Sequence, residues 1–216
     1  TVEHYATYFC LSESGKLFAW GFNNGLLATT WPVPTGSPSN IMADTARTKR
    51  TPVQLTILGE TTFVDFDAST YNDYWIAIGA SGKAYHIGYN GVISGGGANT
   101  IYTYAAIPNP AGVDNATFKY TNVWTFKDRQ ANYALLYLKG NNGKIYFTGG
   151  FNALYNTGVP SLYFRNTPTP TLTTDELLGN IRAVIPREVS FPTNVDIVKM
   201  EIGNPQEERQ TTYALS

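Results

Sequence analysis

The stretch GKLFAWGFN at residues 15–23 occurs three times in this chain in recognisable form. It returns as GKAYHIGYN from Gly82 and as GKIYFTGGFN from Gly143, where the exit is one residue longer. The three glycines are 67 and 61 residues apart, which is longer than common solenoid repeats and near the upper range of propeller blades. The sequence therefore contains an internal repeat with a large unit.

Three further kinds of segment recur upstream of each Gly-Lys turn. Apolar strands that open on a tyrosine are TYFCLSES from Thr7, DYWIAIGAS from Asp73, NYALLYLKGNN from Asn132 and a last, shorter TYALS from Thr212. Inner strands are TFVDFDA from Thr62, KYTNVWTF from Lys119 and NVDIVKMEIG from Asn194. Proline-marked segments are TPVQL from Thr51, IPNP from Ile107 and IPREV from Ile185. Each unit is thus predicted to run from a Pro-led edge strand through an inner and a Tyr-led strand to the Gly-Lys strand, which closes the blade.

The composition favours strands over helices. Apolar residues alternate with polar ones, β-branched and aromatic residues are frequent, and 20 Gly and 12 Pro mark turns. A four-stranded sheet that recurs in this way is typical of a propeller blade. We therefore predict an all-β fold, a β-propeller of four-stranded antiparallel blades. About three blades are present, a partial ring, since closed propellers have about four to eight.

The whole chain, residues 1–216, is predicted to be one propeller segment. Its repeat units cover roughly residues 1–50, 51–106, 107–184 and, in part, 185–216. Insertions are expected near residues 24–50, 91–106 and 152–184, and connections of this length are usually functional or ordered by their own contacts.

At the Gly-Lys strands the chain resembles the RCC1-like repeat propellers. The matching segments are Ser14 to Asn23, Ser81 to Asn90 and Asn142 to Gly149. The sequence departs from the family pattern where Trp20 is replaced by Ile87 and Thr148, and where long insertions stand in place of Gly-x-Leu-Gly. The resemblance implies three contexts: a GTPase exchange factor, a scaffold in signalling or ubiquitin transfer, and a surface propeller of bacterial or viral assemblies.

Charge and motif content exclude several classes of function. The balance of 15 Lys and Arg against 16 Asp and Glu gives a net charge of −1, which offers nothing to nucleic acid or an anionic membrane. No apolar run is long enough for membrane insertion. Cys10, the single cysteine, lies in an alternating apolar stretch and is predicted to be a small buried core residue. The two histidines, His4 and His86, are too few and too far apart for a metal site, and His86 is expected to be satisfied and non-catalytic. We expect no cofactor and no metal.

Evidence for catalysis is weak. No nucleophile motif occurs, and no base lies near Cys10 in the sequence. Asp65 and Asp67 lie on one face of their strand, and such a pair could serve acid-base chemistry or bind calcium. The favoured interpretation is that these carboxylates cap a turn or bond neighbouring backbone. A glycan-cleaving propeller, the enzymatic alternative, would need acidic residues that converge at one blade end. We therefore expect no enzyme activity.

Low charge, abundant Asn, Thr, Gly and Tyr and long insertions are typical of an exposed particle component. We expect a non-enzymatic structural or interaction propeller on a virion or extracellular surface, such as a phage tail or host-attachment protein, with a cytoplasmic regulator of a small GTPase or signalling scaffold as the alternative. Its expected partners are other chains of an assembly or further blades of the same polypeptide, and a surface glycan or receptor. The candidate interaction surface comprises Trp31, Arg47, Lys49, Arg50, Tyr102, Tyr104, Tyr163 and Phe164.

Overall fold

The computed structural model of the chain is built from antiparallel strands. It describes residues 7–22, 48–68, 74–89, 100–126, 134–150, 182–189, 191, 195–203 and 211–216, and no helix occurs among them. The first sheet contains β1 (Thr7–Leu11), β2 (Leu17–Phe22) and β3 (Thr48–Gln54) in that order. The second contains β4 (Phe63–Ala68), β5 (Tyr74–Gly79), β6 (Ala84–Tyr89) and β7 (Thr100–Ala106).

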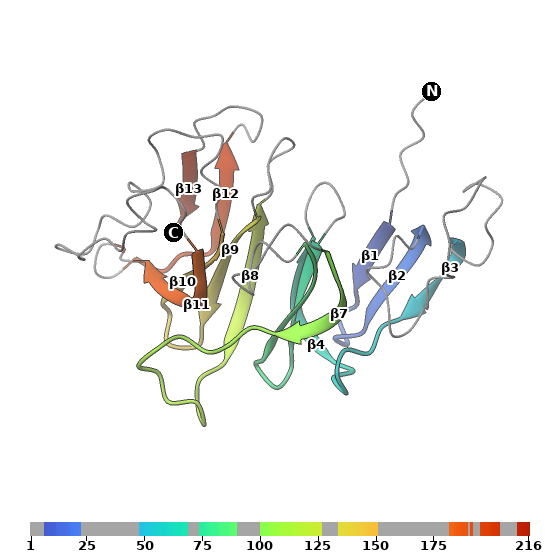
Figure 1. The fold of residues 1–216 in the computed structure, drawn as a ribbon, viewed down its shortest axis with the longest axis horizontal. Coiled ribbons are helices and arrows are strands. Elements are labelled where there is room, and N and C mark those ends of the chain that lie inside the picture. The colour runs from blue at the N-terminus through green and yellow to red at the C-terminus, as the bar shows by residue number, and fades with distance from the viewer. Residues whose placement is uncertain are drawn as a thin grey trace.

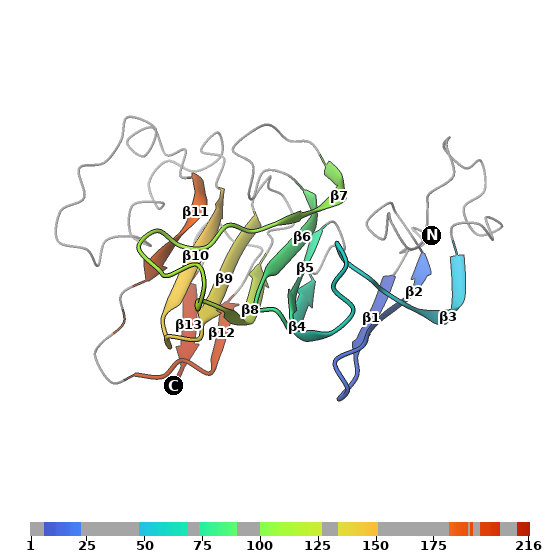
Figure 2. The same ribbon diagram turned by 90° about the horizontal axis from the view of Figure 1, so that it is seen from below.

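The third sheet repeats the second, and a hairpin follows it. Its strands are β8 (Tyr120–Phe126), β9 (Ala134–Gly140), β10 (Ile145–Gly150) and β11 (Arg182–Val189), and the hairpin pairs β12 (Lys199–Gly203) with β13 (Thr211–Leu215). The first sheet and the hairpin lie at opposite ends of the longest axis, with the two four-stranded sheets between them (Figures 1 and 2). This arrangement confirms the predicted partial β-propeller with four-stranded antiparallel blades.

The Gly-Lys turn recurs because each copy makes the same hairpin. Its glycine has a positive φ, between 77° and 86° in the three copies, which is the left-handed region that glycine adopts without steric cost. The glycine N–H donates to the carbonyl three residues earlier; the pairs are Gly15 to Ser12, Gly82 to Gly79 and Gly143 to Gly140. Each turn thereby joins a Tyr-led strand to its Gly-Lys strand.

The order of strands within a unit differs from the prediction. The Pro-led segments of β3 and β11 pair with the preceding Gly-Lys strands β2 and β10, so they end a sheet and do not open the next one. Pro52 and Pro186 lie where the register shifts, on the outermost strand of their sheets, which suits a residue without an N–H. The Gly-Lys strand is therefore third of four. The predicted insertion at residues 91–106 also contains a strand, β7, and the IPNP segment follows it outside any strand.

Three apolar clusters hold successive sheets together. The first joins β1 and β2 to the second sheet through Leu17 and Ala19, which are fully buried. The second cluster joins the second and third sheets, and every residue of β5 is buried. The third cluster joins β9 and β10 to the hairpin through Ile197 and Met200. Each sheet thus buries both faces only where it has a neighbour on both sides.

Candidate functional site

The two aspartates of β4 bind the backbone of the next blade. Asp65 Oδ2 accepts a hydrogen bond from the N–H of Val123 at 2.9 Å, and Asp67 Oδ2 accepts one from the N–H of Thr125 at 2.7 Å. The other carboxylate oxygen of each aspartate accepts from the N–H of its own following residue, at 2.9 Å for Asp65 and 2.8 Å for Asp67. These bonds connect β4 to β8, the innermost strand of the third sheet, so the favoured interpretation of this pair is confirmed.

Burial controls the protonation of this pair. Desolvation raises the pKa of both carboxyls above the usual 3.8, and hydrogen bonds from the backbone of β8 and from the following residue partly oppose the rise. The charge of Asp65 also raises the pKa of Asp67. Among the described residues, no group of three or more His, Cys, Asp or Glu side chains is placed to hold a metal ion. The carboxylates therefore act as acceptors for strand-edge N–H groups that would otherwise lack a partner.

A second bond links consecutive blades at the Gly-Lys turns. The carbonyl of Gly15 accepts from the N–H of Phe63 at 2.8 Å, and the carbonyl of Gly82 accepts from the N–H of Tyr120 at 2.9 Å. Phe63 and Tyr120 begin β4 and β8, the innermost strands of the next sheets. The first two Gly-Lys turns thus fix the start of the blade that follows each of them.

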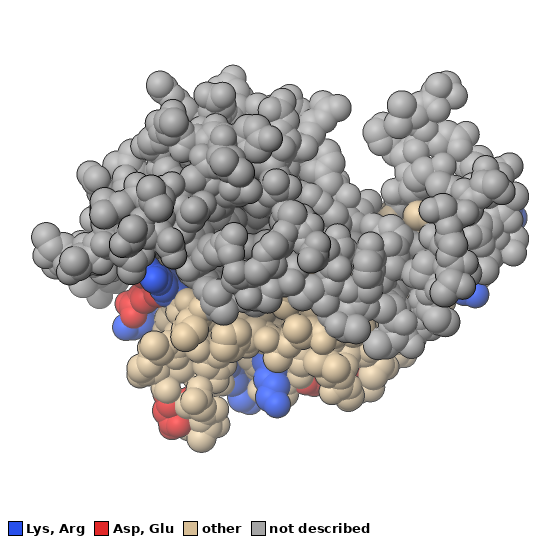
Figure 3. Space-filling model, in the orientation of Figure 1, with Lys and Arg blue, Asp and Glu red and all other residues tan. Residues whose placement is uncertain are grey.

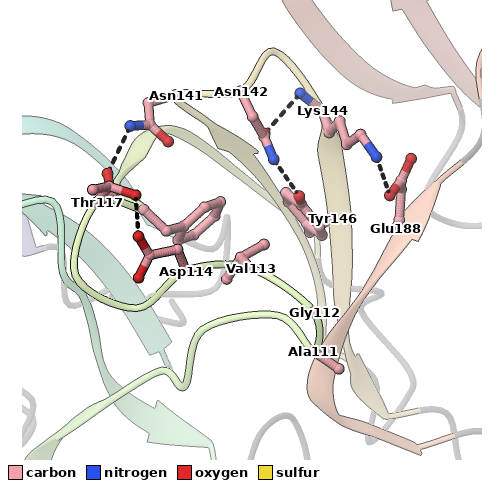
Figure 4. Close-up of a pocket in the computed structure, with 11 residues that line it drawn as sticks. Ala111, Gly112, Val113, Asp114, Thr117, Asn141, Asn142, Lys144, Tyr146 and Glu188 are labelled. Atoms are coloured by element: carbon pink, nitrogen blue, oxygen red, sulfur yellow. Dashed lines mark hydrogen bonds and ion pairs between the residues drawn. The ribbon is translucent and has the colours of Figure 1, made fainter.

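A polar cavity of about 390 Å³ opens beside the third Gly-Lys turn. Asp114, Thr117 and Asn141 lie on one side of it, and Lys144 and Glu188 lie on the other (Figure 4). No sequence motif predicted this cavity. The signal that could have indicated it is the pair Asn141-Asn142, because the other two turns carry Glu13-Ser14 and Ala80-Ser81 at these positions.

The polar groups of the cavity are bonded to one another. Lys144 Nζ contacts Glu188 Oε2 at 2.8 Å, and this hydrogen bond raises the pKa of Lys144. Asn142 Nδ2 donates to the hydroxyl of Tyr146 at 2.8 Å. Thr117 Oγ1 donates to Asp114 Oδ2 at 3.0 Å. These polar side chains of the cavity are therefore already paired with one another.

The described members of the candidate interaction surface do not come together. Lys49 and Arg50 are exposed on β3, at one end of the molecule. The prediction that Tyr104 belongs to an interaction surface was wrong. Tyr104 is only 6% exposed, and its ring packs edge-on against Trp75 with centroids 5.5 Å apart, because it belongs to the cluster between the first two sheets. Tyr102 lies in β7, but its side chain is outside the described residues, as are Trp31, Arg47, Tyr163 and Phe164.

A stacked aromatic pair lies instead on β1 and β2, with Tyr8 exposed and Trp20 half-buried. The rings of Tyr8 and Trp20 stack with centroids 5.6 Å apart and an interplanar angle of 16°. Cys10, which was predicted to be buried, is exposed beside them. The reason is that β1 turns its alternate residues Phe9 and Leu11 toward the second sheet, so Tyr8 and Cys10 face outward.

His86 lies in the second sheet and is only 3% exposed. Its Nδ1 is 3.2 Å from the carbonyl of Ala105, while its Nε2 has no hydrogen-bond partner among the described residues. Desolvation lowers the pKa of His86 to about 4. The imidazole is therefore neutral at pH 7 and packs as a core residue.

His86 should make the fold sensitive to acid. Its pKa lies below the unfolded value of 6.5, so the unfolded chain binds the proton between pH 4 and 6.5 and the folded chain does not. The contribution of His86 to the free energy of unfolding should therefore rise with pH across that window, by up to about 3 kcal/mol, and stay constant above it. Urea titrations at several pH values measure the slope. His86→Gln should remove it and His4→Gln should retain it; a slope unchanged in His86→Gln would assign the effect elsewhere.

The fold and its blade junctions define a β-propeller segment, and solved structures of that class resemble it. Human WBSCR16 matches with a TM-score of 0.52 and 15% identity over 90% of this chain and 39% of its own. Prp20p from Saccharomyces cerevisiae matches with a TM-score of 0.51 and 15% identity over 93% of this chain and 42% of its own. Both are RCC1-family proteins, so the predicted RCC1-like repeat fold is confirmed. The chain spans about two fifths of the length of these structures.

Two other comparisons bear on the chain. No protein-family model and no curated protein sequence matches it. Within the described residues, no helix has the length and apolar character needed to cross a membrane.

Proposed function

We propose that this chain is a non-catalytic interaction propeller and an exposed component of a larger assembly, such as a phage tail or host-attachment apparatus. The observation that carries the proposal is the stacked pair of Tyr8 and Trp20, with Tyr8 54% exposed on the outer face of the first sheet. Aromatic side chains are enriched in the buried centres of protein interfaces, where their large apolar area supplies much of the binding energy.

Two observations support a role without catalysis. Asp65 and Asp67, the best candidates for acid-base chemistry, already accept hydrogen bonds from Val123 and Thr125 of the next blade. The acidic side chains of the cavity are likewise paired, Glu188 with Lys144 and Asp114 with Thr117. Glycan hydrolysis by the purified chain, lost in Asp67→Asn, would contradict this part of the proposal.

Surface composition supports exposure on a particle. Only 14% of the residues are charged, and the face shown in Figure 3 carries few charged side chains, of both signs, on its described part. Such a surface offers little electrostatic attraction to polyanions. A surface glycan or protein receptor is the partner we propose.

Immunogold labelling tests the proposal. Antibodies raised against the purified chain should label particles prepared from the organism that carries the gene, at the tail or fibre region. Serum taken from the same animals before immunisation is the control. Label confined to the cell interior would contradict the assembly role.

Regulation of a small GTPase is a second candidate function. The similarity to Prp20p favours it, because that structure is described together with its binding to Gsp1p and histones. A net charge of −1 gives no support to a nucleic-acid partner for this chain. The rate at which a small GTPase releases a fluorescent GDP analogue, measured with and without the chain, tests this second function. A faster release in the presence of the chain would favour it over the assembly role.

A further inference from the structure

The third Gly-Lys turn carries a pair of residues that can react with each other. Asn142 precedes Gly143 there, whereas Ser14 and Ser81 precede the glycine in the other two turns. Asparagine is among the chemically labile residues. When glycine follows it, the next backbone nitrogen can attack the side-chain amide, because glycine has no Cβ to obstruct the approach. The third turn therefore has a reactivity that the other two turns lack.

Solvent reaches both residues of this pair. Asn142 and Gly143 are exposed at the tip of the hairpin that joins β9 to β10. Loop tips of this kind open locally at a small cost in free energy. Asn142 Oδ1 also accepts a hydrogen bond from the backbone N–H of Lys144 at 3.1 Å, and such a donor polarises the amide carbonyl for attack (Figure 4). A polarised amide and the backbone nitrogen that can attack it thus lie at an exposed position.

Two other hydrogen bonds of the turn oppose the reaction. The N–H of Gly143 donates to the carbonyl of Gly140 at 2.9 Å, so the attacking nitrogen holds its proton in a bond. Asn142 Nδ2 donates to the hydroxyl of Tyr146 at 2.8 Å, and Tyr146 is only 2% exposed, so this bond anchors the amide to a buried side chain. Both bonds must open before the nitrogen can reach the amide carbon. The folded turn should therefore react more slowly than an unfolded chain.

We propose that Asn142 is a site of spontaneous deamidation in the folded protein, at a rate set by opening of the third Gly-Lys turn. Hydroxide removes the proton of the Gly143 nitrogen, which then forms a bond to Asn142 Cγ. The bond from Cγ to Nδ2 breaks, and Nδ2 leaves as ammonia after it takes a proton from water, which restores the hydroxide. Water then adds to either carbonyl of the resulting cyclic imide and opens it, so the products are aspartate and isoaspartate.

The products change both the turn and the cavity beside it. Each product carries a negative charge in place of a neutral amide, at a cavity that Asp114 and Glu188 already line. Isoaspartate also lengthens the backbone by one atom directly before Gly143, whose φ of 77° belongs to the tight turn. Chains modified to isoaspartate should therefore unfold at lower urea concentrations than unmodified chains.

Peptide mapping by mass spectrometry tests this site. The purified chain is kept in mildly alkaline buffer, and the peptide that contains Asn142 should gain, over time, the mass that replacing an amide by an acid adds. Asn141 is the matched control in the same turn, because it is also exposed but is followed by a residue with a Cβ. Asn142→Ser should abolish the gain. The other Asn-Gly pairs, at residues 24–25 and 90–91, fall in different tryptic peptides.

Tyr146→Phe tests the control by hydrogen bonding. It keeps the aromatic ring and removes the hydroxyl that accepts from Asn142 Nδ2. Deamidation at Asn142 should become about fivefold faster, the factor that one ordinary hydrogen bond contributes. In concentrated urea, where the turn is absent, the variant and the unaltered chain should react at equal rates, and both should react faster than the folded chain.

Four results would overturn the inference. They are a folded chain that stays unmodified while the unfolded chain reacts, equal rates in the folded and unfolded chains, no acceleration in Tyr146→Phe, and reaction at Asn141 as fast as at Asn142. These measurements use the purified chain alone, so their outcome is independent of the proposed assembly role and of the immunogold result.

Discussion

Replacing Gly82 by alanine should lower the free energy of unfolding by about 3 kcal/mol or more. The φ of Gly82 is 86°, where a residue with a Cβ is strained by about 1 to 2 kcal/mol. In addition, the new Cβ would lie 2.4 Å from Lys119 Cβ and 2.9 Å from Lys119 Cα. These atoms belong to the backbone region of the next blade, so the two blades must separate or the turn must unfold. Urea denaturation followed by circular dichroism measures the loss.

Gly143→Ala is the control for this substitution. Gly143 has a φ of 77° in the same turn, but no atom of the described residues lies within 4 Å of a Cβ built there. It should therefore show the conformational cost alone. Equal losses in Gly82→Ala and Gly143→Ala would mean that the contact with Lys119 contributes nothing and that the blade junction is not held at this turn.

The double substitution of Asp65 and Asp67 by alanine should cost about 2 to 5 kcal/mol. It would leave the N–H groups of Val123 and Thr125 without their acceptors, and each unsatisfied buried group costs about 1 to 3 kcal/mol. Val123 and Thr125 are buried, at 3% and 8% exposure, so water does not readily reach their N–H groups to replace the carboxylates. Thermal and urea denaturation at pH 7 measure the loss.

Asp114→Ala is the matched control, because Asp114 also accepts two hydrogen bonds but is exposed in a turn. It should cost less than about 1 kcal/mol. The pair also has a pH signature. Since burial raises the pKa of both carboxyls above 3.8, the folded chain binds their protons more tightly than the unfolded chain, and the free energy of unfolding should decrease as the pH rises from 3.8 through the raised pKa. The double Asp→Asn variant should lack this dependence; if it retains it, other groups are responsible.

The sequence predicted the fold because the informative positions are local. The Gly-Lys turns require left-handed glycine, and the strands that flank them alternate in polarity, so both features can be recognised within one unit. The position of the Pro-led strands was wrong because strand pairing is not local: TPVQL can pair with the strand before or after it. Pro52 is compatible with an edge strand in either blade.

The blade junction could be predicted only in part. The spacing of Asp65 and Asp67 indicated two carboxylates on one face, but their partners in β8 are 58 residues away in sequence. Cys10 and Tyr104 were misplaced for a related reason. Alternation shows that a strand has two faces, whereas exposure depends on which face meets another sheet, and only the assembled structure determines that.

The three long connections of the chain share one position in the repeat. Segments 23–47, 90–99 and 151–181 each join a Gly-Lys strand to the last strand of its sheet, β2 to β3, β6 to β7 and β10 to β11. The Gly15 and Gly82 bonds between blades lie at the turn end. One end of the propeller is thus committed to holding blades together, while the other accepts changes in length and composition at little entropic cost. Natural selection can therefore exchange these connections whole, and laboratory libraries could randomise the same three segments, without touching the framework.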